Sequence, residues 1–158
     1  MHYDGLSQVV SADTSSAGST VPYVLDPSGQ RVALHYWVSG FDNAQYLVTT
    51  FDVVHDAVDP RGMLRAIREA LRSDGVYVCL DINCSDRLEE NVGPKGALFH
   101  GFSILLCMTM SLAAHGEGLG TLGLHPAKLE ELCAEAGFGE VRQVPIENPF
   151  NNLYEIRP

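Results

Sequence analysis

The chain has 158 residues, of which 46% are hydrophobic and 19% charged, a composition typical of one globular domain rather than a disordered segment. Its formal net charge is −10 at pH 7, so its surface repels phosphate backbones and anionic lipid, which predicts neither a nucleic-acid nor a membrane partner. Four cysteines stand apart without a C-x-x-C pair, which indicates reduced thiols in a cytoplasmic protein; no set of ligand residues has metal spacing, so no metal is predicted.

The first part of the chain predicts little regular structure. Residues 1–20 are rich in Ser, Thr, Ala and Gly without a clear period, and we interpret them as a loose arm before one domain over residues 21–158. A basic start followed by an apolar run is lacking, so no secretory signal is predicted. Within the domain, VPYVLD (21–26) and RVALHYWV (31–38) are short strand candidates bounded by turn residues.

The middle of the chain predicts two strands separated by a helix. YLVTTFDV (46–53) is apolar enough for a strand that is buried on both faces, as parallel strands are. Asp59 is a candidate N-cap and Pro60 suits the first turn of a helix, which the turn residues SDG (73–75) end. VYVCLDI (76–82) then predicts the next strand.

The last third of the chain predicts two helices and a hairpin. Residues 96–114 are strongly apolar, and we interpret them as a core or subunit-interface helix rather than a membrane span; the alternative is a lining for an apolar substrate. HPAKLEELCAEAGF (125–138) is an amphipathic helix stopped by Gly137, and EVRQVPI and NNLYEIR predict a closing hairpin. This order of elements predicts an α/β fold with an antiparallel edge.

Polar side chains follow two of the predicted strands. His55 and Asp56 come after the first strand, and Asp81 ends the second. Ligands bind beyond the carboxyl ends of strands in open α/β sheets, where a histidine can take a proton and a carboxylate can orient it. The alternative is that Asp56 and Asp59 only cap the following helix, with His55 as a structural residue at the strand end.

Three segments carry a family resemblance: YLVTTFDVVHDAVDP, MLRAIREALRSDGVYVCLDIN and KLEELCAEAGFGEVRQVPIENPFNNLYEIRP. Together they resemble the C-terminal half of a class I S-adenosylmethionine-dependent methyltransferase, in particular the small-molecule O-methyltransferases. The resemblance implies a partial Rossmann-like methyltransferase sheet, mostly parallel with an antiparallel C-terminal hairpin, that is truncated on its N-terminal side.

The resemblance also implies residue roles, with S-adenosylmethionine as cofactor. His55 matches the catalytic base that removes the proton from a substrate hydroxyl, and Asp81 matches the acid that steers this histidine. The positions that would contact the cofactor are Phe41, Asp42, Phe51 and Asp52.

The N-terminal segment departs from the family pattern. Methyltransferases of this class hold the cofactor on a G-x-G-x-G turn, whereas the glycines of residues 1–45 are well separated. Two hypotheses follow: a methyltransferase acting on a small-molecule hydroxyl, or a non-catalytic methyltransferase-fold subunit or binding module. The apolar 96–114 helix and the open strand edges of a truncated sheet predict a homo-oligomer.

Overall fold

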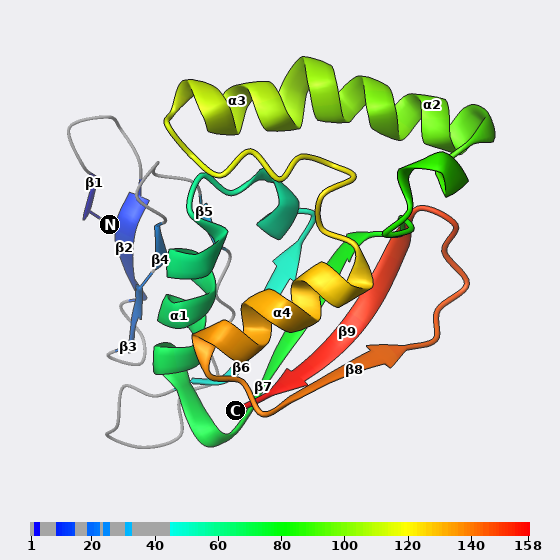
Figure 1. The fold of residues 1–158 in the computed structure, drawn as a ribbon. Helices are drawn as coiled ribbons and strands as arrows, with labels where there is room; N and C mark the ends of the chain where they lie inside the picture. The colour runs from blue at the N-terminus through cyan, green and yellow to red at the C-terminus, as the bar shows by residue number, and fades with distance from the viewer. Residues whose placement is uncertain (1, 4–8, 15–18, 23, 26–30, 33–44) are drawn as a thin grey trace.

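The structure is a computed structural model, and a four-stranded mixed sheet forms its centre (Figure 1). Its strands occur in the order β6 (Gln45–Phe51), β7 (Leu71–Ile82), β9 (Asn151–Arg157) and β8 (Glu140–Val144). β6 and β7 are parallel, whereas β9 is antiparallel to both of its neighbours. The predicted α/β class and C-terminal hairpin are therefore confirmed. The residues described are 2–3, 9–14, 19–22, 24–25, 31–32 and 45–158.

The register of the parallel pair places two strand ends side by side. Leu47 lies opposite Val76 and Phe51 opposite Leu80, so the residues that follow each strand emerge at the same edge of the sheet. β7 begins five residues earlier than predicted, because Leu71 already pairs with Gln45 before the register shifts.

Two helices cover one face of this sheet (Figure 1). In α1 (Pro60–Ala70), Asp59 caps the N-terminus by accepting from the backbone N–H of Gly62 at 2.7 Å, as predicted. α4 (Pro126–Ala136) ends at Gly137, whose φ of 89° is the left-handed conformation that glycine adopts without strain. The fully buried core side chains include Val48, Met63, Leu64, Ile67, Tyr77, Leu129, Leu132 and Ile156.

β6 is buried on both faces over Val48, Thr49 and Thr50, as its composition predicts, but not toward its two ends. Leu47 is 39% exposed and Phe51 is 54% exposed, while Val48 is fully buried beneath the helices. The reason is that β6 has a strand neighbour on one side only within the described sheet, and the helices of the core cover a single face.

A long apolar helix crosses above the carboxyl end of the parallel strands (Figure 1). It comprises α2 (Gly93–Phe102), a π-helical turn η3 (Ser103–Cys107) and α3 (Met108–Ala113). Of the two predicted roles, core or subunit interface, most of this helix does not fill the first within the single chain, and the interface role stays a prediction. Its exposed side chains are Leu98, Phe102, Ile104, Leu105, Leu106, Met110 and Leu112. Among the described residues this is the one helix long and apolar enough to cross a bilayer, by length and composition only.

The N-terminal segment contains more regular structure than its composition predicted. Among the described residues, β1 (His2–Tyr3), β2 (Val9–Thr14) and β3 (Ser19–Pro22) pair as an antiparallel sheet in place of the expected loose arm. β4 (Val24–Leu25) and β5 (Arg31–Val32) form a second antiparallel pair. Short 3₁₀ turns η1 (Val54–Asp56) and η2 (Leu88–Glu90) complete the described elements.

Candidate active site

The end of β6 turns sharply to present a histidine. Asp52 has a positive φ of 51°, and its backbone N–H still donates to Leu80 O at 2.9 Å, so the turn begins directly at the last ladder bond. The 3₁₀ turn η1 then holds His55, which is only 5% exposed. Asp56 remains part of this turn and does not cap α1, a role that Asp59 performs.

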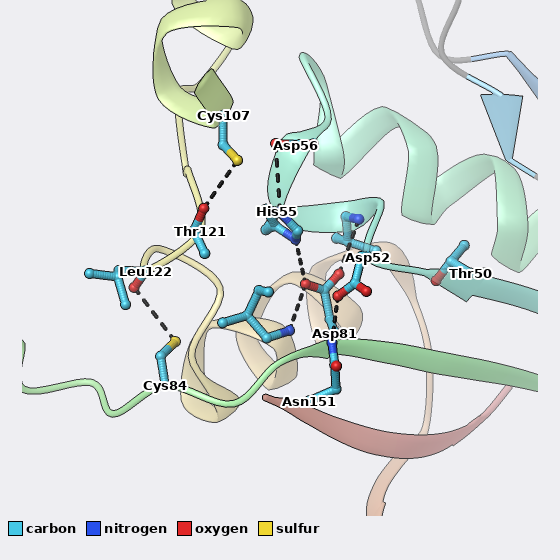
Figure 2. Close-up of polar contacts among 12 residues, drawn as sticks. Thr50, Asp52, His55, Asp56, Asp81, Cys84, Cys107, Thr121, Leu122 and Asn151 are labelled. Atoms are coloured by element: carbon cyan, nitrogen blue, oxygen red, sulfur yellow. Dashed lines mark hydrogen bonds and ion pairs between the residues drawn. The ribbon is translucent and has the colours of Figure 1, made fainter. Parts of the chain in front are cut away.

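Asp81 joins the ends of the two parallel strands (Figure 2). Its Oδ1 lies 2.6 Å from His55 Nδ1 and accepts the backbone N–H of Ile82 at 2.8 Å. Its Oδ2 accepts the backbone N–H of Val54 at 3.1 Å. Asp81 is only 1% exposed, and three nitrogen groups hold its carboxylate in place. The proximity of His55 and Asp81 agrees with the prediction that the two strands end side by side.

This contact determines the state of the imidazole. A carboxylate has no hydrogen to donate, so Nδ1 of the neutral ring carries the proton and Nε2 retains a lone pair. Burial lowers the pKa of His55, but the hydrogen bond and charge of Asp81 and the charges of Asp56 and Asp52 raise it, and the net shift is upward. The geometry suits a base that takes a proton at Nε2 and is stabilised as a cation at Nδ1.

A pocket of about 360 Å³ adjoins His55. Its polar lining residues include Asp52 and Asp56. Much of the remaining lining is apolar, because the long helix and the β8–β9 connection contribute hydrophobic side chains, namely Leu98, Phe99, Phe102, Leu106 and Phe150. The 96–114 helix therefore contributes part of the pocket lining. This agrees with the alternative interpretation of its sequence, in which its apolar side chains line a pocket for an apolar substrate.

Asn151 is a polar pocket residue that the sequence analysis missed. Its Nδ2 donates to Asp52 Oδ1 at 2.5 Å, because the first residue of β9 lies opposite Ile82 in the sheet register. Burial and the charge of Asp81 raise the pKa of Asp52. The only feature of the sequence that pointed to a role for Asn151 was the predicted C-terminal hairpin. That prediction did not specify that β9 would pair with β7.

Four residues had been assigned to cofactor contact. Phe51 and Asp52 lie at the carboxyl end of β6, and the Phe51 ring is 54% exposed. Phe41 and Asp42 lie outside the described residues.

Ser111 fastens the long helix above η1. Its hydroxyl donates to Ala57 O at 3.2 Å and accepts the backbone N–H of Gly118 at 3.1 Å. The next loop approaches the helix closely at Gly120, where φ is 69° and an added Cβ would lie 2.5 Å from Ser103 Oγ. These contacts place Cys107 and Thr121 near the His55 turn (Figure 2).

The tertiary structure brings together donor atoms that show no metal spacing in the sequence. His55, Asp56 and Cys107 offer ligand atoms that lie within 4.8 Å of one another. Asp52, His55 and Asp81 form a second such group. Sequence spacing missed both groups because their members come from different segments of the chain.

No protein-family model matches the chain, and no curated protein matches it either. Solved structures do resemble it. A candidate O-methyltransferase from Nostoc punctiforme is 19% identical, with a TM-score of 0.54 over 75% of this chain and 33% of its own. The methyltransferase CalH, solved with SAH, is 17% identical, with a TM-score of 0.52 over 73% of this chain and 31% of its own.

The mitomycin 7-O-methyltransferase MmcR is 17% identical, with a TM-score of 0.50 over 75% of this chain and 31% of its own. At such identities the likeness shows the fold, a partial Rossmann-like sheet of the O-methyltransferase type. The chain spans about a third of the length of these solved structures.

Proposed function

We propose that this chain carries the base of an S-adenosylmethionine-dependent methyltransferase that modifies a hydroxyl group of a small molecule. The observation that carries the proposal is the 2.6 Å contact between His55 Nδ1 and Asp81 Oδ1 at the carboxyl ends of two parallel strands. The O-methyltransferase-type fold and the pocket beside His55 support it.

The proposed chemistry is a single proton transfer coupled to methyl transfer. S-adenosylmethionine, when bound, supplies an electrophilic methyl group on a sulfonium. His55 Nε2 would accept the proton of the substrate hydroxyl, which would make that oxygen the nucleophile for the methyl group. Asp81, held by backbone N–H groups at Ile82 and Val54, keeps the imidazole oriented and stabilises its cationic form.

The described residues fit the cofactor in part. The exposed ring of Phe51 suits apolar contact with a flat heterocycle, and the Asp52 carboxylate suits a hydroxyl or cationic group. Phe41 and Asp42 are proposed adenine contacts on the family resemblance alone. Residues 1–45 contain no G-x-G-x-G turn. We therefore infer that the methionine part of S-adenosylmethionine would be held by residues other than such a glycine-rich turn.

The pocket limits the substrate that we propose. Its apolar wall suits a largely hydrophobic molecule, and the carboxylates of Asp52 and Asp56 disfavour an anionic one. We further propose a cytoplasmic location, because Cys79, Cys84, Cys107 and Cys133 are all free and buried.

A second candidate function is a non-catalytic subunit with the same fold. The observation that favours it is the exposed apolar surface of the α2–η3–α3 helix, where Leu105 is 81% exposed. A surface of this kind suits contact with another chain more than contact with water.

Calorimetry with S-adenosylmethionine separates the two functions. We expect the purified chain to bind the cofactor, and we expect labelled methyl transfer to hydroxylated aromatic compounds to fall roughly 10²–10⁴-fold in His55→Gln. Cofactor binding should persist in His55→Gln, because the ring acts on the substrate proton. His100→Gln, on α2 and outside the pocket lining, is the matched control. A lack of binding at millimolar cofactor would contradict the catalytic proposal and favour the non-catalytic subunit.

A further inference from the structure

Three side chains of different chemistry lie close together in the pocket lining (Figure 2). His55 and Asp56 come from η1, and Cys107 comes from the end of η3 in the helix above. His55 Nε2 lies 3.6 Å from Asp56 Oδ1, and the three ligand atoms lie within 4.8 Å of one another. Imidazole, carboxylate and thiolate are the protein ligands that Zn²⁺ prefers.

The histidine is already oriented as a ligand. Asp81 holds Nδ1 at 2.6 Å, which leaves Nε2 as the lone-pair donor on the side of Asp56. Metal-binding histidines are commonly arranged in this way, with a carboxylate on the second ring nitrogen that fixes the tautomer and raises ligand basicity.

Asp56 carries an unsatisfied atom at this place. Its Oδ1 is buried and has no hydrogen-bond partner within the described part of the chain. A buried carboxylate oxygen without a partner is unfavourable, so a cation bound there would satisfy it. This orphaned oxygen is the one that faces His55 Nε2.

Cys107 is held in place by its own set of contacts. Cys107 is the last residue of the π-helical turn η3 and is 4% exposed, whereas the neighbouring Leu106 is 50% exposed. The buried hydroxyl of Thr121 donates to Cys107 Sγ at 3.0 Å. A hydroxyl donor to sulfur is a second-shell contact that would orient a thiolate ligand and partly balance its charge.

We propose that His55 Nε2, Asp56 Oδ1 and Cys107 Sγ bind one zinc-type divalent cation, with the fourth position open to the pocket. Zn–N and Zn–O bonds of about 2.0–2.1 Å and a Zn–S bond of about 2.3 Å place tetrahedral ligand atoms roughly 3.3–3.6 Å apart. The Nε2–Oδ1 separation of 3.6 Å is slightly longer than the roughly 3.3–3.4 Å that the Zn–N and Zn–O bonds require, and all three ligand atoms lie within 4.8 Å of one another, so the ligands must move closer together as the metal binds. The thiol proton is released to solvent as the metal–sulfur bond forms.

The site has a consequence for His55. A metal ion on Nε2 uses the same lone pair that proton abstraction from a substrate would use, so the metal-bound chain and the chain with a free base exclude each other. The metal site itself stands on the three ligand atoms and does not require the proposed methyl transfer to be correct.

Titration of the chelator-treated chain with Co²⁺ and Zn²⁺ tests the proposal without any activity assay. We expect one equivalent of Co²⁺ to give a near-ultraviolet thiolate-to-metal absorption band, which one equivalent of Zn²⁺ removes by displacement. Binding stoichiometry follows from calorimetry with Zn²⁺ alone.

Matched variants assign the ligands. Cys107→Ser should abolish the thiolate band, whereas Cys84→Ser should retain it, because Cys84 is a comparably buried thiol that lies against Leu122 O outside the ligand group. Asp56→Asn and His55→Gln should each weaken Zn²⁺ binding by about tenfold or more. A thiolate band that persists in Cys107→Ser, Zn²⁺ affinity unchanged in Asp56→Asn, or no binding at tens of micromolar metal would each overturn the proposal. Circular dichroism of each variant establishes that it is folded.

Discussion

Asp81 Oδ2 accepts the backbone N–H of Val54 at 3.1 Å, which locks the residue immediately before His55 to the neighbouring strand. The other carboxylate oxygen faces His55 Nδ1 and the backbone N–H of Ile82. Both oxygens therefore face nitrogen donors, and Asp81 itself is only 1% exposed. Orientation of the histidine and anchoring of its turn depend on the same side chain.

Asp81→Asn should accordingly destabilise the protein although it preserves shape. An amide presents only one acceptor oxygen, so its NH₂ group must face at least one of the N–H donors that the carboxylate satisfied. We expect a loss of about 1–3 kcal/mol in the free energy of unfolding, measured by urea denaturation.

The same variant has a spectroscopic signature. If the amide NH₂ faces the ring, Nδ1 becomes the acceptor and the proton of neutral His55 moves to Nε2, which ¹⁵N NMR of the imidazole detects. Unchanged stability together with an unchanged tautomer would show that Asp81 does not orient His55.

The raised pKa of His55 predicts a pH dependence of stability. Burial alone lowers this pKa, but Asp81, Asp56 and Asp52 more than offset burial, so the folded-state pKa exceeds the usual value of about 6.5. The stabilising contribution is fully present below the unfolded-state pKa and is lost as pH rises through the folded-state pKa.

Urea denaturation of wild type and His55→Gln across this window, with chelator present, measures the effect. The stability difference in favour of wild type should shrink as the pH increases above about 6.5. A difference that is constant with pH, or that grows, would mean that His55 is not stabilised as a cation.

Gly120 is predicted to be intolerant of a side chain. Its φ of 69° is unfavourable for L-residues, and an added Cβ would lie 2.5 Å from Ser103 Oγ and 2.6 Å from Met108 Cγ. We expect Gly120→Ala to lower the free energy of unfolding by at least about 1–2 kcal/mol.

Gly101→Ala is the control for this experiment, because Gly101 lies within α2 and an added Cβ there meets no atom within 4 Å. Because alanine has a higher helix propensity than glycine, the free energy of unfolding of Gly101→Ala should equal that of the wild type or exceed it by up to about 1 kcal/mol. Equal thermal stability of the two variants would show that the loop does not approach the helix as described.

The exposed apolar face of the long helix leads us to expect self-association. Leu105, Ile104 and Met110 are each more than half exposed, and burying such side chains between two copies removes apolar surface from water. Light scattering across micromolar concentrations should give a dimer or a larger assembly, and Leu105→Glu should shift it toward monomer. A wild-type protein that is monomeric throughout this range would contradict the expectation.

Local chemistry allowed several elements to be predicted from the sequence. The Asp59–Pro60 start of α1 and the Gly137 stop of α4 are set by neighbouring residues, through a side-chain cap, a fixed proline φ and a left-handed glycine. The contact between His55 and Asp81 was also predictable, because parallel strands end at the same edge of a sheet. These features need no knowledge of distant packing.

Other features depend on where whole segments lie. Composition made the ends of β6 and the 96–114 helix look buried, but burial depends on which surfaces a partner covers, and the core helices cover one face of the sheet. The π-helical turn at Ser103–Cys107 likewise has no signal in the apolar pattern of the sequence.

By itself the sequence determined the α/β order of elements, the caps that begin and end α1 and α4, and the strand-end pairing of a histidine with an acid. Only the tertiary structure decided that Asn151 meets Asp52, since this requires β9 to insert antiparallel beside β7. It alone also placed Cys107 beside Asp56, because the long helix must cross above η1 and be fastened there by Ser111. Contacts between segments far apart in the chain are selected by the packing of the whole domain, which neither spacing nor local propensity encodes.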